Sequence, residues 1–258
     1  MLNYENVSLT YPGTSTPVKA LDRYSLTVAK GEPVALIGPS GCGKSTSLLL
    51  ATGLLSPSEG EVLVDGKPVN KPRRETALIL QDFGLLPWKT VFENAALGLC
   101  IRRFSKAERK TRVERALEQV GLSDFAKMYP GELSGGMRQR LALARTLALD
   151  VDVMLMDEPL SALDAMLREG LQDLLLTLWQ QRGYTQVLVT HSIEEAVFLG
   201  RRIVVLSPRP GRVMTIIDNP KMGTFDYRGT EGFYRTCQLV RKALKAETSR
   251  SEGSSHGA

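Results

Sequence analysis

The chain has 258 residues, of which 43% are hydrophobic and 24% are charged, a composition typical of a globular protein with a substantial core. Its formal net charge of +5 comes from 33 basic and 28 acidic residues spread along the chain. This dispersed excess argues against a nucleic-acid partner, which a basic block or patch would favour, and indicates an ordinary solvated surface.

Apolar runs and cysteines bear on location. The most apolar stretches, such as residues 34–37 and 153–156, are far shorter than the roughly 20 residues that cross a bilayer. The N-terminus has no basic segment followed by an apolar run, as a secretory signal would. Cys42, Cys100 and Cys237 are scattered and show no C-x-x-C spacing. We therefore expect a cytoplasmic protein with free thiols.

Residues 1–75 show the alternation of β-strands. Tyr24, Leu26 and Val28 alternate with polar neighbours, as do two valines before the turn at Asp65 and Gly66. This pattern predicts an antiparallel β layer.

A phosphate-binding loop lies within that layer. The apolar run 34–37 predicts a strand covered on both faces, and residues 45–51 predict a helix. The segment between them matches G-x-x-x-x-G-K-[ST] and comprises Gly38, Pro39, Ser40, Gly41, Cys42, Gly43, Lys44, Ser45 and Thr46. In such a loop backbone N–H groups surround phosphates, Lys44 reaches the β and γ oxygens, and Ser45 ligates Mg²⁺. We interpret Cys42 as a small filler residue rather than a redox group.

The middle of the chain, from about 87 to 150, is helical in pattern. Ser105 and Glu108 form a predicted capping box, and Gly121 stands where a helix over about 106–120 would end. We interpret this part as a helical insertion.

Strands and helices alternate in the second half. Apolar runs at 153–156, 186–190 and 203–206 are separated by a leucine-rich helix and by a short helix capped by Ser192. This order predicts a parallel sheet with right-handed crossovers. A last helix is predicted at about 231–246, followed by a disordered Ser/Gly-rich tail at 247–258.

Two carboxylates follow the strand at 153–156. Asp157 and Glu158 stand at its carboxyl end, where ligand crevices open in α/β sheets. By itself such a pair would cap a helix as often as it would catalyse. Beside a phosphate loop, Asp157 is expected to hold Mg²⁺ and Glu158 to act as the general base on water, in a protein that binds a nucleotide with Mg²⁺.

A second anion site follows further along the chain. Ser134, Gly135 and Gly136 stand at the start of a predicted helix and offer a hydroxyl and bare N–H groups to phosphate. One nucleotide does not need two such sites in one chain. With the flanking Leu133 and Gln139, the segment resembles the signature of the ABC ATPase family. That resemblance implies a head-to-tail dimer, in which this segment closes over the γ-phosphate held by the other subunit.

The remaining family motifs occur in order over about residues 1–217. By resemblance, Tyr11 stacks on adenine, Gln81 reaches Mg²⁺ and the attacking water, Asp164 belongs to the Ser161–164 motif, and His191 contacts the γ-phosphate. Each has an alternative: packing for Tyr11, a surface amide for Gln81, and capping or packing for His191.

The resemblance implies an α/β fold: a P-loop NTPase (RecA-like) core with an antiparallel β subdomain and an inserted α-helical subdomain. The ABC nucleotide-binding domain is expected over 1–246, with the β subdomain and core at about 1–86 and 151–217, the helical subdomain at about 87–150 and the last helix at about 231–246.

Two segments are similar to the nitrate/sulfonate/taurine importer branch. They are Leu-Leu-Pro-Trp at 85–88 and Ser-Pro-Arg-Pro-Gly-Arg at 207–212, although Asp82-Phe83-Gly84 departs from the usual wording of that branch. Pro87 and Trp88 suit helix-start packing and partner contact equally. The resemblance implies an ATPase subunit at the cytoplasmic face of the membrane, with membrane permease subunits, a second ATPase copy and, indirectly, a periplasmic or extracellular solute-binding protein as partners.

Three other functions are possible for a chain with these nucleotide-binding motifs. A chromosome-associated ABC ATPase would need a long heptad insertion or zinc modules, which the sequence lacks. A soluble assembly ATPase of the iron–sulfur scaffold type is the main alternative. A non-hydrolysing regulatory module is disfavoured, because every expected catalytic position is filled.

Overall fold

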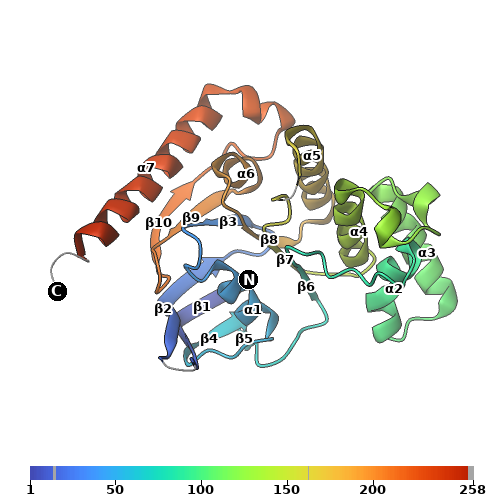
Figure 1. Cartoon of the computed structure of the whole chain (residues 1–258), viewed down its shortest axis with the longest axis horizontal. Helices are drawn as coiled ribbons and strands as arrows, with labels where there is room; N and C mark the ends of the chain where they lie inside the picture. Colours follow the sequence, from blue (N-terminus) through green and yellow to red (C-terminus); the bar gives the residue numbers. More distant parts are fainter. Residues whose placement is uncertain (14–15, 162, 255–258) are drawn as a thin grey trace.

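A computed structural model describes residues 1–13, 16–161 and 163–254 (Figure 1). Ala162, within the motif that starts at Ser161, and residues 255–258 of the predicted tail lie outside the described residues.

The N-terminal part forms a four-stranded antiparallel sheet in the order β2-β1-β4-β5. Its strands are β1 (Leu2–Tyr11), β2 (Val18–Val28), β4 (Glu59–Val64) and β5 (Lys67–Pro68). The alternating Tyr24, Leu26 and Val28 are all buried. Asp65 and Gly66 take positive φ values of 49° and 73° and form the turn between β4 and β5. The predicted β layer is confirmed.

A second sheet has six strands in the order β10-β9-β3-β8-β7-β6. They are β3 (Pro33–Ile37), β6 (Thr76–Ile79), β7 (Val153–Asp157), β8 (Thr185–Val189), β9 (Arg202–Leu206) and β10 (Val213–Asp218). All neighbours pair in parallel except β10, which runs antiparallel to β9. The predicted parallel sheet is confirmed, and its carboxyl ends meet at one edge.

Both faces of the parallel sheet are covered. Val34 and Leu36 of β3 join a core with α1 (Lys44–Thr52) and the antiparallel sheet, whereas Ala35 and Ile37 face a second core. That second core contains residues of α5 (Ala165–Arg182) and α6 (Ile193–Leu199). Burial on both faces explains why β3 is a continuous apolar run.

The middle of the chain is helical, as predicted. It contains α2 (Val91–Ile101), α3 (Lys106–Gln119) and α4 (Gly135–Leu147), with short 3₁₀ turns η1 (Ser123–Phe125) and η2 (Pro130–Glu132). Figure 1 shows α2, α3 and α4 grouped at one end of the molecule. Ser105 accepts a hydrogen bond from the Glu108 N–H at 3.2 Å, and the Glu108 carboxylate accepts one from the Ser105 N–H at 3.0 Å. The predicted capping box is therefore confirmed.

The last helix is longer than predicted. After the 3₁₀ turn η3 (Phe225–Gly229), α7 runs Glu231–Ser254, past the predicted helix end at about 246, and the predicted disorder of the tail stays a prediction. Extending an existing helix costs little, because each added residue gains a hydrogen bond without a new nucleation step. Phe233, Cys237 and Val240 are buried at helical spacing, as predicted.

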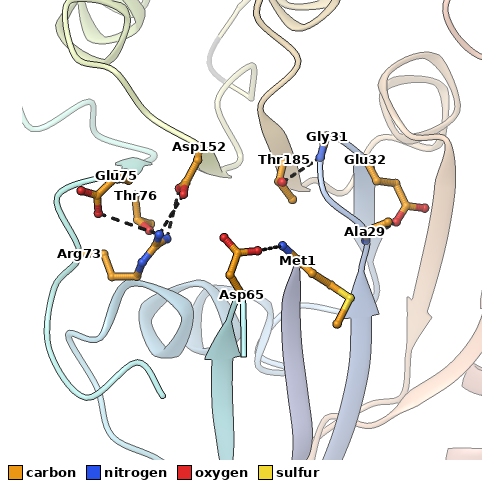
Figure 2. Close-up of polar contacts among 10 residues, drawn as sticks. All are labelled: Met1, Ala29, Gly31, Glu32, Asp65, Arg73, Glu75, Thr76, Asp152 and Thr185. Atoms are coloured by element: carbon orange, nitrogen blue, oxygen red, sulfur yellow. Dashed lines mark hydrogen bonds and ion pairs between the residues drawn. The ribbon is translucent and has the colours of Figure 1, made fainter. Parts of the chain in front are cut away.

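The amino ends of the parallel strands are held by polar contacts, which Figure 2 shows. The Arg73 guanidinium donates to the Asp152 carboxylate at 2.9 Å, just before β7, and the Gly31 N–H donates to the Thr185 hydroxyl at 3.0 Å at the start of β8. The N-terminal ammonium pairs with Asp65 at 2.5 Å, and this contact lowers the pKa of Asp65. These contacts leave the opposite, carboxyl edge for other groups.

Within the described ranges, we find no helix with the length and apolar character to span a bilayer.

Candidate nucleotide site

The glycine-rich loop joins β3 directly to α1, and its backbone requires glycine. Gly41 and Gly43 have φ values of 72° and 95°. A Cβ added to Gly43 would stand 2.6 Å from Leu21 Cδ2 and 2.9 Å from the Ala20 oxygen. Side chains are excluded there by backbone conformation and by contact with β2 together.

The lysine of the loop is folded back over it. Lys44 Nζ donates to the Gly38 and Pro39 oxygens at 2.8 Å each. The Cys42 side chain is fully buried beneath the loop, and burial raises the pKa of its thiol. These positions fit the interpretation of Cys42 as a small filler residue.

A cavity of about 300 Å³ opens above the loop. The Tyr11 hydroxyl, at the end of β1, lies 3.3 Å from Thr46 Oγ1. The lining residues come from the loop, two strands of the antiparallel sheet, the acidic pair and the turn after β9: Tyr11, Val18, Ala20, Ser40, Gly41, Gly43, Lys44, Ser45, Thr46, Glu158 and Arg209. Val18, Ala20 and Arg209 were not predicted as site residues. They lie apart from the loop in the sequence, and only the folded chain brings them next to it.

The acidic pair ends β7, next to β8 and two strands from β3. Glu158 has a positive φ of 46°, and its N–H donates to the Val189 oxygen at 2.9 Å. The Asp157 carboxyl is partly buried, and this burial together with Glu158 raises its pKa. A hydrogen bond from Ser45 and the charge of Lys44 act in the opposite direction.

His191 approaches the same carboxylate from the end of β8. Its Nδ1 lies 3.1 Å from Glu158 Oε2. The turn that presents His191 is held from below, because the Thr190 hydroxyl donates to Glu195 Oε2 at 2.6 Å and accepts from the Ser192 N–H at 3.0 Å. Glu195 is 3% exposed, and burial raises its pKa to about 7. The sequence around Glu195, with Glu194 before it and Ala196 after it, does not indicate that this carboxyl lies below His191.

The oxygen groups at this edge fit Mg²⁺. The expected ligands are the Ser45 hydroxyl, the Asp157 carboxylate and the Gln81 amide, all hard donors that suit this ion. Within the described ranges, no three His, Cys, Asp or Glu side chains gather into a metal cage.

Several predicted site residues do not line the cavity in this chain, among them Gln81, the segment Ser134 to Gly136 and Asp164. Gln81 is exposed two residues after β6. Ser134 caps α4 by accepting from the Met137 N–H at 3.3 Å, with Gly135 and Gly136 in the first turn. Asp164 caps α5 by accepting from the Leu167 N–H at 3.0 Å. The predicted contacts of these groups with nucleotide stay predictions.

The helix α4 is tied to two loops at the carboxyl edge. The Gln139 amide donates to the Pro159 oxygen, next to Glu158. Arg145 Nη1 donates to the Gly84 oxygen at 2.6 Å, in the loop that follows Gln81. The helix capped by Ser134 is thus hydrogen-bonded both to the residue that follows the acidic pair and to the Gln81 loop.

Known proteins resemble this chain over most of its length. The family described as "ABC transporter" matches residues 21–161. The taurine import ATP-binding protein TauB of Roseobacter denitrificans is 47% identical over 76% of this chain and 73% of its own length. TauB of Pseudomonas aeruginosa is 45% identical over 83% of this chain and 81% of its own length.

Solved structures of a dimeric ABC transporter cassette have the same fold as this chain. The dimeric structure of MJ0796, a bacterial ABC transporter cassette, superposes with a TM-score of 0.76 at 35% identity, over 84% of this chain and 98% of that one. The same cassette has been solved as a dimer in a post-hydrolysis state with ADP and Pi, with the same TM-score and identity. The fold expected from the sequence is confirmed, and the chain belongs to the ABC transporter ATP-binding family as an ATPase whose hydrolysis of ATP is coupled to transport.

Proposed function

We propose that this chain energises an importer of taurine, or of a similar small solute such as a sulfonate or nitrate. Two observations support the proposal. Relatives named as taurine import ATP-binding proteins are 45–47% identical. The two segments at 85–88 and 207–212 are similar to that importer branch. The relatives named above give no support to the alternative of the iron–sulfur scaffold type.

The observation that carries the chemistry is the contact between Glu158 and His191 beside the loop cavity. Glu158 Oε2 is 3.1 Å from His191 Nδ1, and Glu158 also lines the cavity that Lys44 enters. A carboxylate in this place acts as a general base on the attacking water, and His191 orients it and contacts the γ-phosphate.

Binding of ATP falls to the loop residues and Tyr11. Lys44 would exchange the Gly38 and Pro39 oxygens for phosphate oxygens, while loop N–H groups surround the β-phosphate. Tyr11 would stack on adenine, at the side of the cavity formed by Val18 and Ala20. Mg²⁺ would be held by Ser45, Asp157 and Gln81 and would neutralise phosphate charge.

A second copy completes the site. Ser134, Gly135 and Gly136 lie outside the cavity of their own chain, which suits contact with the nucleotide of the other subunit. Asp164, in the neighbouring motif, would also contribute at this interface. We favour two identical chains, as in the dimeric cassette structures.

A groove in the helical part suits the permease. A cavity of about 760 Å³ between α2 and α3 is lined largely by apolar atoms, with Phe92, Ala96 and Leu97 among its residues. Trp88, just before α2, is 71% exposed, so partner contact is the better interpretation of this residue. Docking here would place the chain at the cytoplasmic face of the membrane, with a solute-binding protein on the other side. We propose one nucleotide-binding domain over 1–246, divided as the sequence analysis gave it.

The test is Glu158→Gln with MgATP, compared with the unchanged chain. We expect bound ATP with turnover reduced at least about 100-fold, and a dimer by light scattering, because the amide keeps the shape but cannot take a proton. Glu118→Gln changes an exposed carboxylate on α3, which does not line the cavity, and serves as the control. Normal turnover of E158Q would overturn the assignment of the base. For the importer, co-purification with a polytopic permease supports the proposal, whereas soluble scaffold subunits contradict it.

A further inference from the structure

The turn after β9 is fixed against the phosphate loop. The Gly211 N–H donates to the Ala20 oxygen at 2.8 Å, and the Gly211 oxygen accepts from the Asp22 N–H at 3.1 Å. A Cβ added to Gly211 would stand 2.0 Å from the Cys42 oxygen. The turn therefore packs on β2 and on the loop itself.

Side chains hold the turn from within. Ser207 Oγ donates to the Pro208 and Pro210 oxygens at 2.8 and 3.0 Å and accepts from the Arg212 N–H at 3.0 Å. Arg212 also pairs with the Asp22 carboxylate. Arg209 lies between these fixed points, so its Cα is set by the fold rather than by a free loop.

Arg209 reaches the loop cavity, which it lines together with Ser40, Gly41 and Lys44. Within the part of the chain that the structure describes, its guanidinium has no hydrogen-bond or ion-pair partner, in contrast to Arg212 in the same turn. A guanidinium is always charged and presents donors that match phosphate oxygens. An unpaired cation thus borders the place where the nucleotide's negative charge is expected.

We propose that Arg209 is a further ligand of the phosphate chain of the bound nucleoside di- or triphosphate. It supplies a second cation to the cavity that Lys44 lines, from a turn outside the loop motif. This inference rests on the proposed binding of ATP in the loop cavity and adds a residue to it. The branch-like segment 207–212 thereby gains a physical role at the nucleotide site.

The test is calorimetric titration of MgADP and of adenosine into the unchanged chain and into Arg209→Ala, Arg209→Lys and Arg201→Ala. Arg201 is an exposed arginine directly before β9, at the end of the strand away from the turn. Its replacement by alanine removes the same charge as R209A, but away from the cavity. We expect R209A to weaken MgADP about tenfold or more, as loss of a charge-assisted hydrogen bond does, with adenosine affinity unchanged. R209K should retain part of the affinity, and R201A all of it. Added salt should weaken binding less in R209A than in the unchanged chain.

Three results would overturn the inference. In the first, R209A binds MgADP within twofold of R201A. In the second, R209A weakens MgADP and adenosine by the same factor, which would place Arg209 on the base. In the third, the unchanged chain does not bind MgADP, in which case the proposed function fails as well. Thermal melting of each variant checks folding, since an exposed side chain should leave the melting temperature unchanged.

Discussion

Arg145 of α4 donates a 2.6 Å hydrogen bond to the oxygen of Gly84, 61 residues earlier in the chain. Its other nitrogen donates to the Phe83 oxygen. The guanidinium is largely buried, and this burial lowers its pKa. The contact joins the helix that begins at the signature segment to the loop that follows Gln81.

Replacing Arg145 by Lys should impair turnover more than nucleotide binding. A lysine keeps the charge but cannot donate to two adjacent carbonyls at once, so the Gln81 loop would lose a fixed position. We expect kcat to fall about tenfold with MgADP affinity within threefold of the unchanged chain. Arg138→Lys, on the same helix, is the control, since the Arg138 guanidinium has no hydrogen bond or ion pair with the described residues. Equal kcat in both variants would show that the contact does not matter for turnover.

Loss of His191 should reduce hydrolysis sharply. The His191→Ala chain lacks the only imidazole within the described residues and leaves Glu158 without its 3.1 Å partner. Because positioning and charge dominate phosphoryl transfer, we expect kcat to fall about 100-fold or more. Steady-state phosphate release measures it, with MgADP affinity as the check on binding. A kcat within threefold of the unchanged chain would remove His191 from the mechanism.

Glu195→Gln should alter how stability depends on pH. Burial raises the pKa of Glu195 from 4.5 to about 7, so the folded chain binds a proton that the unfolded chain releases between these pH values. The raised pKa therefore contributes fully to the free energy of unfolding below about pH 4.5. This contribution is lost as pH rises through about 7. Relative to E195Q, which keeps an acceptor for Thr190, the unchanged chain should lose about 2 kcal/mol between about pH 5.5 and 8.

Urea unfolding of both chains at the two pH values measures this difference. The groups that face Glu195 are Thr190, His191, Arg168 and Glu158. Parallel pH profiles of the two chains would show that Glu195 does not titrate in this range.

Cys100 and Cys42 should react with a thiol reagent in order of exposure. Cys100 is exposed, whereas Cys42 is fully buried and its pKa is raised by that burial, which lowers the thiolate fraction. We expect rapid labelling of Cys100 with ATPase activity retained, then slow labelling of Cys42 with loss of activity. MgATP should slow the second step by holding the loop closed. Mass spectrometry assigns the labels, and full activity after complete Cys42 labelling would contradict the prediction.

Short-range sequence patterns predicted the features that depend on local spacing. The strand at 34–37, the phosphate loop and the capping box at Ser105 follow from short-range geometry, because a few neighbouring residues set a turn, a cap or a buried strand. The structure confirms each of these elements. The family followed from the order of several such motifs along the chain.

Contacts between residues that are far apart in the sequence became visible in the tertiary structure alone. Arg209 stands beside the phosphate loop, Arg145 holds the Gly84 carbonyl, and Glu195 supports the turn of His191. None of these contacts has a sequence signature, because strand order and helix packing, rather than spacing along the chain, determine which side chains become neighbours. The end of α7 was also not predicted, because a polar segment that continues a helix resembles a polar segment that follows the end of one.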